Sequence, residues 1–459
     1  MSLSSSVKTK EIEAVYYQQN GRVEFRLQPD KLYSTDLIIG NLGILKAADQ
    51  TSYHPWAGVY GSVKNATLFD GNTELSNLSD LGAWSGFKML NKSNQYSKSI
   101  STYYNGARHG SLWNYSDTNA NCVAAGGLLN HGASISNATE FRDLITKNLE
   151  STTYKGLLKL RQVFDLLNKL SYVDTSIFKN FRIVLEFDVN DNRVIGGRSG
   201  DGDCSTTRPF LLAHEVIDEE ILGSMMGRMG NIIYEEIEND QTQIPAVTGM
   251  TNTSRYVEQV NNYHVSAFNG KMVGRLLLWK QPSQQENQRQ MTVNGSVAGM
   301  GVFNSTGFLG EAEQVRINGR NVIARSGIVG SNRRLAHVVD TWGECSIPTF
   351  GNGLAYAEAT AIPRSRIVRE GNEDYGNLDF VGVDLAGERC SDLQIDLTRR
   401  GLFLNSDGED DKTGANGYLN DTVRTANSKY NSAHNLSIWC EIKKAIVPDK
   451  QGGYNVVYV

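Results

Sequence analysis

The chain has 459 residues and a mass of 50.7 kDa, more than one hydrophobic core usually supports, so we expect two domains. Hydrophobic residues make up 40% of it and charged residues 21%, which excludes a disordered protein and predicts ordered globular domains. The net charge of -5 argues against a protein that wraps nucleic acid by neutralising phosphates. We therefore expect no direct sequence-specific nucleic-acid binding.

The five cysteines are spread along the chain without a close pair, which favours buried, reduced thiols over a zinc site or a disulfide framework. They are Cys122, Cys204, Cys345, Cys390 and Cys440. Residues 1–10 carry Lys8 and Lys10 among Ser and Thr, and they predict a flexible arm instead of a signal peptide. No later run reaches the roughly 20 apolar residues of a membrane span. We expect synthesis in the cytosol and no transmembrane segment.

Short runs rich in Val, Ile, Leu, Phe and Tyr dominate the chain, separated by clusters of Gly, Asn, Asp and Ser. Many bends between strands would suit a chain with 45 Gly and only 8 Pro. The sequence therefore predicts a mainly β protein built from antiparallel β-sandwiches, with helix in the minority. The predicted strands cover residues 23–27, 37–39, 59–69, 181–187, 232–237, 273–279, 393–397 and 436–446.

Helical spacing is clearest between residues 137 and 170, where apolar side chains recur every three or four positions. They are Phe141, Leu144, Ile145 and Leu149, and then Leu160, Val163, Phe164 and Leu167. Asn137 followed by Glu140 is a typical helix start, and the stretch 151–156 should interrupt the helix. We expect two amphipathic helices that pack on a sheet.

A polar stretch after the strand at 232–237 marks the junction between the two domains. Residues 238–245 and 248–254 are rich in polar residues and turn formers. We therefore predict a flexible arm over residues 1–10, a first domain over 11–243 and a second domain over 244–459.

The two halves show the same order of elements, which predicts a duplication. A strand ends in Asp70-Gly71 in the first half and in Asn318-Gly319 in the second, and such pairs supply the positive φ of a tight turn. An apolar helical segment follows in each half, over residues 78–90 and 333–342. We further predict that each half ends on a strand pair, 181–187 with 232–237 and 393–397 with 436–446.

Reactive residues form no pattern that predicts catalysis, a cofactor or a metal. The histidines lie at 54, 109, 131, 214, 264, 337 and 434, without the helical pair of a zinc protease. Phosphate-binding Gly-rich loops and the nucleophile elbow are missing from the sequence. Two acidic loops, 200–203 and 407–411, could offer oxygens to calcium, but their spacing favours solvated surface loops. We predict no enzyme, no catalytic or cofactor-binding residue and no metal site.

Several blocks resemble the major capsid proteins of virophages, Polinton elements and Polinton-like viruses. In the first half they are WAGVYGSVKNATLFDGNTEL at residues 56–75, the stretch 84–94, and IFKNFRIVLEFD at residues 177–188. In the second half they are VRINGRNV at residues 315–322 and RRLAHVVDTWG at residues 333–343. The blocks occur in the same order as in that family and cover about a fifth of the chain.

The resemblance implies two tandem eight-stranded antiparallel jelly rolls, a double jelly roll, with a few short helices in the connections. It also implies a homotrimeric, pseudo-hexagonal capsomer that tiles the icosahedral shell of a small double-stranded DNA virus. The partners would be other copies of the chain and the penton and minor capsid proteins of the same virion, and the location would be the virion capsid after synthesis in the host cytosol. Residues 118–137 and 283–310, rich in Gly and Asn, would form loops at the capsid faces.

Two other functions remain open at this stage. A trimeric carbohydrate-binding jelly-roll protein, of a virion or of the secreted lectin type, could stack sugars on Trp56, Trp84 and Trp113. The missing signal peptide and the strand-helix blocks argue against it. A hydrolase is the weaker alternative, because no acid-base or nucleophile constellation stands out.

Overall fold

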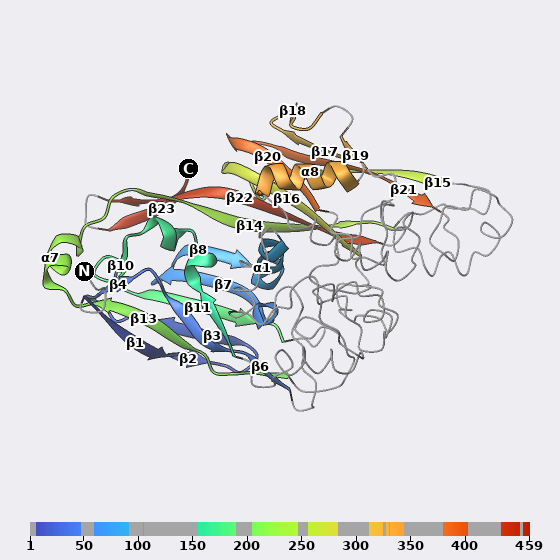
Figure 1. Ribbon diagram of the computed structural model, residues 1–459. Helices are drawn as coiled ribbons and strands as arrows, with labels where there is room; N and C mark the ends of the chain where they lie inside the picture. Colours follow the sequence, from blue (N-terminus) through green and yellow to red (C-terminus); the bar gives the residue numbers. More distant parts are fainter. Residues whose placement is uncertain are drawn as a thin grey trace, which may run out of the picture.

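The structure is a computed structural model that describes residues 6–46, 59–90, 104, 155–189, 204–246, 256–282, 312–324, 327–329, 331–343, 380–402, 433–449 and 453–459. In these residues antiparallel sheets form two sandwiches, blue to green and green to red in Figure 1. The predicted mainly β fold is confirmed. No helix among the described residues is long and apolar enough to cross a membrane.

The first sandwich contains two main sheets, and its strands come from residues 7–216. They are β1 (Val7–Glu13), β2 (Tyr16–Tyr17), β3 (Arg22–Arg26), β4 (Leu32–Ser34), β5 (Ile38–Leu42), β7 (Val63–Asp70), β8 (Thr73–Ser79), β9 (Gly156–Lys159), β10 (Tyr172–Asp174), β11 (Phe181–Phe187) and β13 (Phe210–Val216). In one sheet β13 pairs with β1, β4 and β5. β10 pairs with β4, and β9 pairs with β5. The other sheet has the order β2-β3-β11-β7-β8, and the short strands β6 (Ile44–Lys46) and β12 (Cys204–Thr206) pair separately.

The second sandwich also contains two sheets, and its strands come from residues 232–458. They are β14 (Ile232–Ile244), β15 (Tyr256–His264), β16 (Met272–Pro282), β17 (Ala312–Ile317), β18 (Arg320–Asn321), β19 (Ile328–Val329), β20 (Phe380–Arg389), β21 (Leu393–Leu402), β22 (His434–Pro448) and β23 (Tyr454–Tyr458). One sheet has the order β14-β22-β16-β20, with β23 also on β22. The other has the order β15-β21-β17-β18, with β19 also on β17.

The strand order of the two sandwiches is the same when each is followed in chain order. The sheet β1-β13-β5-β9 corresponds to β14-β22-β16-β20, and the sheet β3-β11-β7-β8 corresponds to β15-β21-β17-β18. In each half eight strand positions are divided between two antiparallel four-stranded sheets, which is the jelly-roll arrangement. The predicted duplication is therefore present in the topology.

The turn that suggested the duplication occupies the same place in both halves. Gly71 has a φ of 57° in the hairpin between β7 and β8, and Asn318 and Gly319 have φ values of 52° and 76° between β17 and β18. Positive φ at both central residues is what a two-residue Asn-Gly hairpin requires. The predicted helices follow as α1 (Leu81–Leu90) and α8 (Ser331–Trp342).

Two segments differ from the sequence prediction because local contacts overrule the periodicity. Residues 59–62, predicted as strand, form the 3-10 helix η2 (Val59–Ser62), which the Ser62 hydroxyl closes by donating to the Val59 carbonyl at 2.6 Å. The helix predicted around 160–167 is only η3 (Leu160–Gln162) and α5 (Leu166–Lys169), because Leu160 N bonds Leu37 O beside β9. The helix predicted around 137–149 and the loops 118–137 and 283–310 lie outside the described residues.

The predicted strand pairs 181–187 with 232–237 and 393–397 with 436–446 are wrong. β11 lies between β3 and β7, and β21 lies between β15 and β17. β14 instead pairs along its whole length with β22, from Ile232↔Ile446 to Ile244↔His434. Hydrophobic runs identify strands but not their partners. We therefore propose that the second jelly roll begins at β14, after a linker that contains α7 (Glu219–Met225), and not at residue 244.

The predicted flexible arm ends earlier than expected, since residues 7–10 belong to β1. Ion pairs help to hold β1 on its neighbour β13. The buried carboxylate of Glu215, on β13, pairs with Lys10 of β1 and, at 3.1 Å, with Lys31. Burial alone would raise the pKa of Glu215, but hydrogen bonds and charge from the two lysines outweigh it and leave the pKa lowered.

We predict that Glu215→Gln lowers the free energy of unfolding at neutral pH by about 1–2 kcal/mol. Because the folded pKa lies below the ordinary value of 4.5, the wild-type advantage is full above that pH and disappears as the pH falls through the folded pKa. Urea unfolding of both proteins between pH 7 and pH 3 measures this. Glu13→Gln, which changes a carboxylate 82% exposed, is the control, and a pH-independent difference would contradict the prediction.

Candidate functional site at the junction of the two jelly rolls

An aromatic cluster joins the two jelly rolls beside α1, which Figure 1 shows between the two sandwiches. Trp84 of α1 stacks on Trp439 of β22 with ring centroids 5.4 Å apart, and meets Trp342 of α8 edge-on at the same distance. Phe87 of α1 also packs edge-on against Trp342, at 5.8 Å. All four side chains are buried. Such ring pairs contribute about 0.5–1.5 kcal/mol each beyond their buried area.

Two glycines let the helices approach their neighbours closely enough to bring these rings together. A Cβ on Gly82 of α1 would lie 2.9 Å from Gly61 Cα and 3.0 Å from Tyr60 O. A Cβ on Gly382 of β20 would lie 2.9 Å from Val338 Cα of α8. Both contacts are with backbone, so any larger residue would displace a helix and the aromatic side chain it carries.

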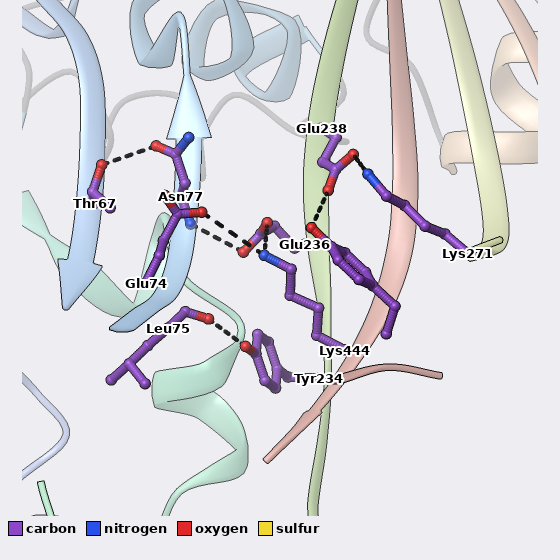
Figure 2. Close-up of polar contacts among 10 residues, drawn as sticks. Thr67, Glu74, Leu75, Asn77, Tyr234, Glu236, Glu238, Lys271 and Lys444 are labelled. Atoms are coloured by element: carbon purple, nitrogen blue, oxygen red, sulfur yellow. Dashed lines mark hydrogen bonds and ion pairs between the residues drawn. The ribbon is translucent and has the colours of Figure 1, made fainter. Parts of the chain in front are cut away.

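The junction also holds a buried ion pair, between β8 of the first jelly roll and the strands β14 and β22 of the second (Figure 2). Lys444 Nζ lies 2.6 Å from Glu236 Oε1, and the side chains are only 5% and 3% exposed. The second carboxylate oxygen of Glu236 accepts a hydrogen bond from the backbone N–H of Asn77 at 3.0 Å. Glu74 lies 3.9 Å from the same ammonium group. One ion pair of the second jelly roll is thus completed by the first.

Lys444 stays charged in this position. Burial by itself lowers the pKa of the Lys444 ammonium, but the nearby Glu236 carboxylate, with smaller contributions from Tyr458 and Glu74, raises it above its ordinary value. A buried charge held in this way is costly to leave without its partner.

Three tyrosines add polar contacts around the ion pair. The buried Tyr234 hydroxyl donates to the Leu75 carbonyl of β8, and burial raises the pKa of this phenol. Tyr454 of β23 donates to Asp70 Oδ2 at 2.6 Å and packs on Phe178, both in the first jelly roll. The C-terminal strand therefore contacts both halves of the molecule.

Tyr458, the third of these tyrosines, holds the other end of β23 on the second jelly roll. Its hydroxyl lies 3.2 Å from Glu238 Oε1. The other carboxylate oxygen of Glu238 accepts a hydrogen bond from Lys271 Nζ at 2.5 Å. The ammonium groups of Lys271 and Lys444 lie 4.7 Å and 5.1 Å from the Tyr458 ring centroid.

The carboxylates of the junction are paired with lysines, backbone amides and tyrosine hydroxyls. Within the described ranges no three His, Cys, Asp or Glu side chains come together in a way that could hold a metal. The acidic loops 200–203 and 407–411 lie outside those ranges, so the expectation that they are solvated loops without a metal stays a prediction.

The structure describes the side chains of two of the five cysteines and of one of the three tryptophans to which the sequence assigned a role. Cys390 and Cys440 are buried free thiols, as expected, and burial raises the pKa of both. Trp84 is 6% exposed inside the aromatic cluster, so it offers no platform to a sugar. Trp56 and Trp113 lie outside the described residues, as do the side chains of the other three cysteines.

Sequence reasoning missed the junction as a site. Glu236 and Lys444 each lie inside an apolar run that was predicted only as a strand. A charged residue within such a run was the available signal, because a buried charge requires a partner. Its partners are distant in the sequence, and no local pattern connects residues 77, 236 and 444.

Comparisons with known proteins agree with this architecture. No protein-family model and no curated protein matches the chain. Among solved structures, a quasi-atomic model of the PBCV-1 virus capsid superimposes with a TM-score of 0.54 at 10% identity, covering 99% of this chain and 97% of that chain. PBCV-1 VP54, fitted into a reconstruction of the virophage Sputnik, gives a TM-score of 0.50 at 10% identity with the same coverage.

These two structures, together with the strand order, establish the fold. The chain has the double jelly-roll fold that viral major capsid proteins adopt. The fold predicted from the resemblance to virophage proteins is therefore confirmed. The mavirus major capsid protein gives a TM-score of 0.49 at 11% identity, covering 99% of this chain and 90% of that chain.

We predict that Lys444→Met destabilises the chain by about 3–5 kcal/mol, because it leaves the buried Glu236 carboxyl, whose pKa burial already raises, without its cationic partner. Adding Glu236→Gln to the same chain should recover part of this loss. Chemical denaturation of the single and double variants measures the coupling. Lys443→Met is the matched control, since the neighbouring lysine on β22 is only half-buried. Equal losses for the two lysines would contradict the assigned role of the pair.

Trp84→Ala should cost about 3–5 kcal/mol, since it removes a ring that bridges the two sandwiches. The same change should expose Trp342 and Trp439 to water and shift tryptophan emission to longer wavelength before any unfolding. Fluorescence of the folded variant, together with its denaturation midpoint, tests this. An unshifted spectrum at native midpoint would show that the cluster does not join the halves.

Proposed function

We propose that the chain is a major capsid protein that assembles as a homotrimeric, pseudo-hexagonal capsomer and tiles the icosahedral shell of a small double-stranded DNA virus. The fold supports this, because it is the fold of the PBCV-1 capsid structure. The observation that carries the proposal is the repeated strand order of the two jelly rolls, joined through one buried junction.

Two similar sandwiches in each chain give a trimer six similar wedges. A three-fold assembly of such a chain has a nearly hexagonal outline, and hexagonal units cover a surface without gaps. The outline is maintained only if the two wedges keep a constant angle. The ion pair of Glu236 and Lys444, which is completed by Asn77, and the cluster around Trp84 supply that rigidity.

The proposed role is structural and places the chain in the virion after synthesis in the host cytosol. Its partners would be neighbouring copies, together with the penton and minor capsid proteins of the same particle. We propose no catalytic step and no direct sequence-specific nucleic-acid binding, in line with a net charge of -5. The carbohydrate-binding alternative loses support, because one of its three proposed platforms, Trp84, is buried.

We predict that the purified chain has a solution mass of about three times its 50.7 kDa, by light scattering after size exclusion. At higher concentration it should form hexagonal arrays or closed shells that electron microscopy detects. The trimer should persist on dilution, since a permanent subunit interface buries about 2,000 Å² or more. A monomer that never assembles would overturn the proposed function, and glycan binding by that monomer would revive the alternative.

A further inference from the structure

Strand β23 leaves one of its edges without a partner strand among the described residues. Among the described strands it pairs only with β22, antiparallel, from Lys444↔Tyr458 to Pro448↔Tyr454. Val459 N bonds Lys443 O and Asp449 N bonds Gly453 O, so the odd-numbered residues of β23 direct their backbone groups toward β22. The N–H and C=O groups of the even-numbered residues 454, 456 and 458 consequently point away from β22.

This edge lacks the charges that the edge strands β1 and β14 carry. β1 carries two lysines and two glutamates, and β14 carries four acidic residues. The sequence of β23, Tyr-Asn-Val-Val-Tyr, contains neither charge nor proline. Proteins usually block exposed edges with lysine, proline or bulges, because an uncharged edge pairs readily with another strand.

An apolar surface lies beside the free edge. Register places Ile233, Ala445 and Val457 side by side on β14, β22 and β23, on one face of the sheet. Ile233 is 56% exposed and Val457 is 41% exposed. The next row on this face pairs Glu235 with Lys443, so the surface is close to neutral. The opposite face of the same strands is buried against the first jelly roll through Tyr234 and Lys444.

We propose that β23 of one chain pairs antiparallel with β23 of a second copy, across a two-fold axis at Val456. A neutral surface with a backbone edge suits neither a nucleic acid nor an anionic membrane, since both require lysine and arginine. A second uncharged β23 matches it without charge repulsion, whereas two copies of the acidic strand β14 would repel each other. In this register Val457 of one chain faces Asn455 of the other.

The symmetry of this contact determines its place in an assembly. An antiparallel pair of identical strands is isologous and forms around a two-fold axis, while a trimer requires head-to-tail contacts. The β23 pair would therefore link chains of different trimers. This placement between trimers rests on the proposed capsid function, whereas the pairing itself does not.

The double variant Asn455→Cys with Val457→Cys tests the pairing directly. Both side chains are exposed, so the fold should tolerate them, and thermal unfolding verifies this. Mild oxidation of the purified full chain should give a covalent dimer on a non-reducing gel. The matched control is Val260→Cys with Asn262→Cys, the same residue types at the same spacing on the exposed edge strand β15.

We expect at least about ten-fold more dimer from the β23 variant than from the β15 control. No dimer, or equal amounts from both variants, would overturn the pairing. This result is independent of the solution mass of the unmodified chain, so failure of the trimer and failure of the β23 pair can be told apart.

Val457→Lys tests the placement between trimers. It should leave the mass at three chains and reduce the formation of arrays or shells by about ten-fold or more, while Val260→Lys assembles like the wild type. Loss of the trimer itself in Val457→Lys, or unchanged assembly, would overturn the placement.

Discussion

A buried ion pair is stable only where each of its partners is held in position. The pair of Glu236 and Lys444 has partners in both jelly rolls, so it constrains how the two halves are placed. Its third contact, the backbone N–H of Asn77, comes from the first jelly roll. A shift of one sandwich that broke the Asn77 contact while the site stayed closed to water would leave an oxygen of the buried carboxylate unsatisfied, which costs several kcal/mol. The relative position of the two jelly rolls is therefore part of the free energy of folding, and is not left to a flexible linker.

The two jelly rolls have the same topology, but strands of the second also contribute side chains to the core of the first. Along β16, Leu276 and Leu278 face the interior of the second sandwich, while Leu277 and Trp279 belong to the core of the first. β22 behaves in the same way, with Ile438 on one side and Trp439 on the other. A strand that is buried on both faces reads as a continuous apolar run without alternation. That explains the unbroken run of Leu and Trp in β16.

The sequence allowed most strands and hairpins to be predicted, but not which distant strands pair with each other. Asn318-Gly319 identified its hairpin because an Asn-Gly pair at positive φ leaves few alternatives, and the strands were visible as apolar runs bounded by turn formers. The membership of β14 in the second jelly roll was missed, because nothing in residues 232–237 specifies pairing with residues some 200 positions later. The junction was hidden for the same reason. Its polar contacts join residues 77, 236 and 444, and its ring cluster joins 84, 342 and 439.

The shared core also has a consequence for the order in which the chain can mature during synthesis. Trp439 and Ile446 complete the core around the first jelly roll, yet they lie more than 200 residues after β13, the last strand of that jelly roll. Domains generally fold as units from the N-terminus as they emerge. Here the first sandwich must wait for β22 of the second before its apolar surface is covered. A chain that stops before β22 would keep that surface exposed, which distinguishes it from a folded chain and marks it for removal by chaperones and proteases.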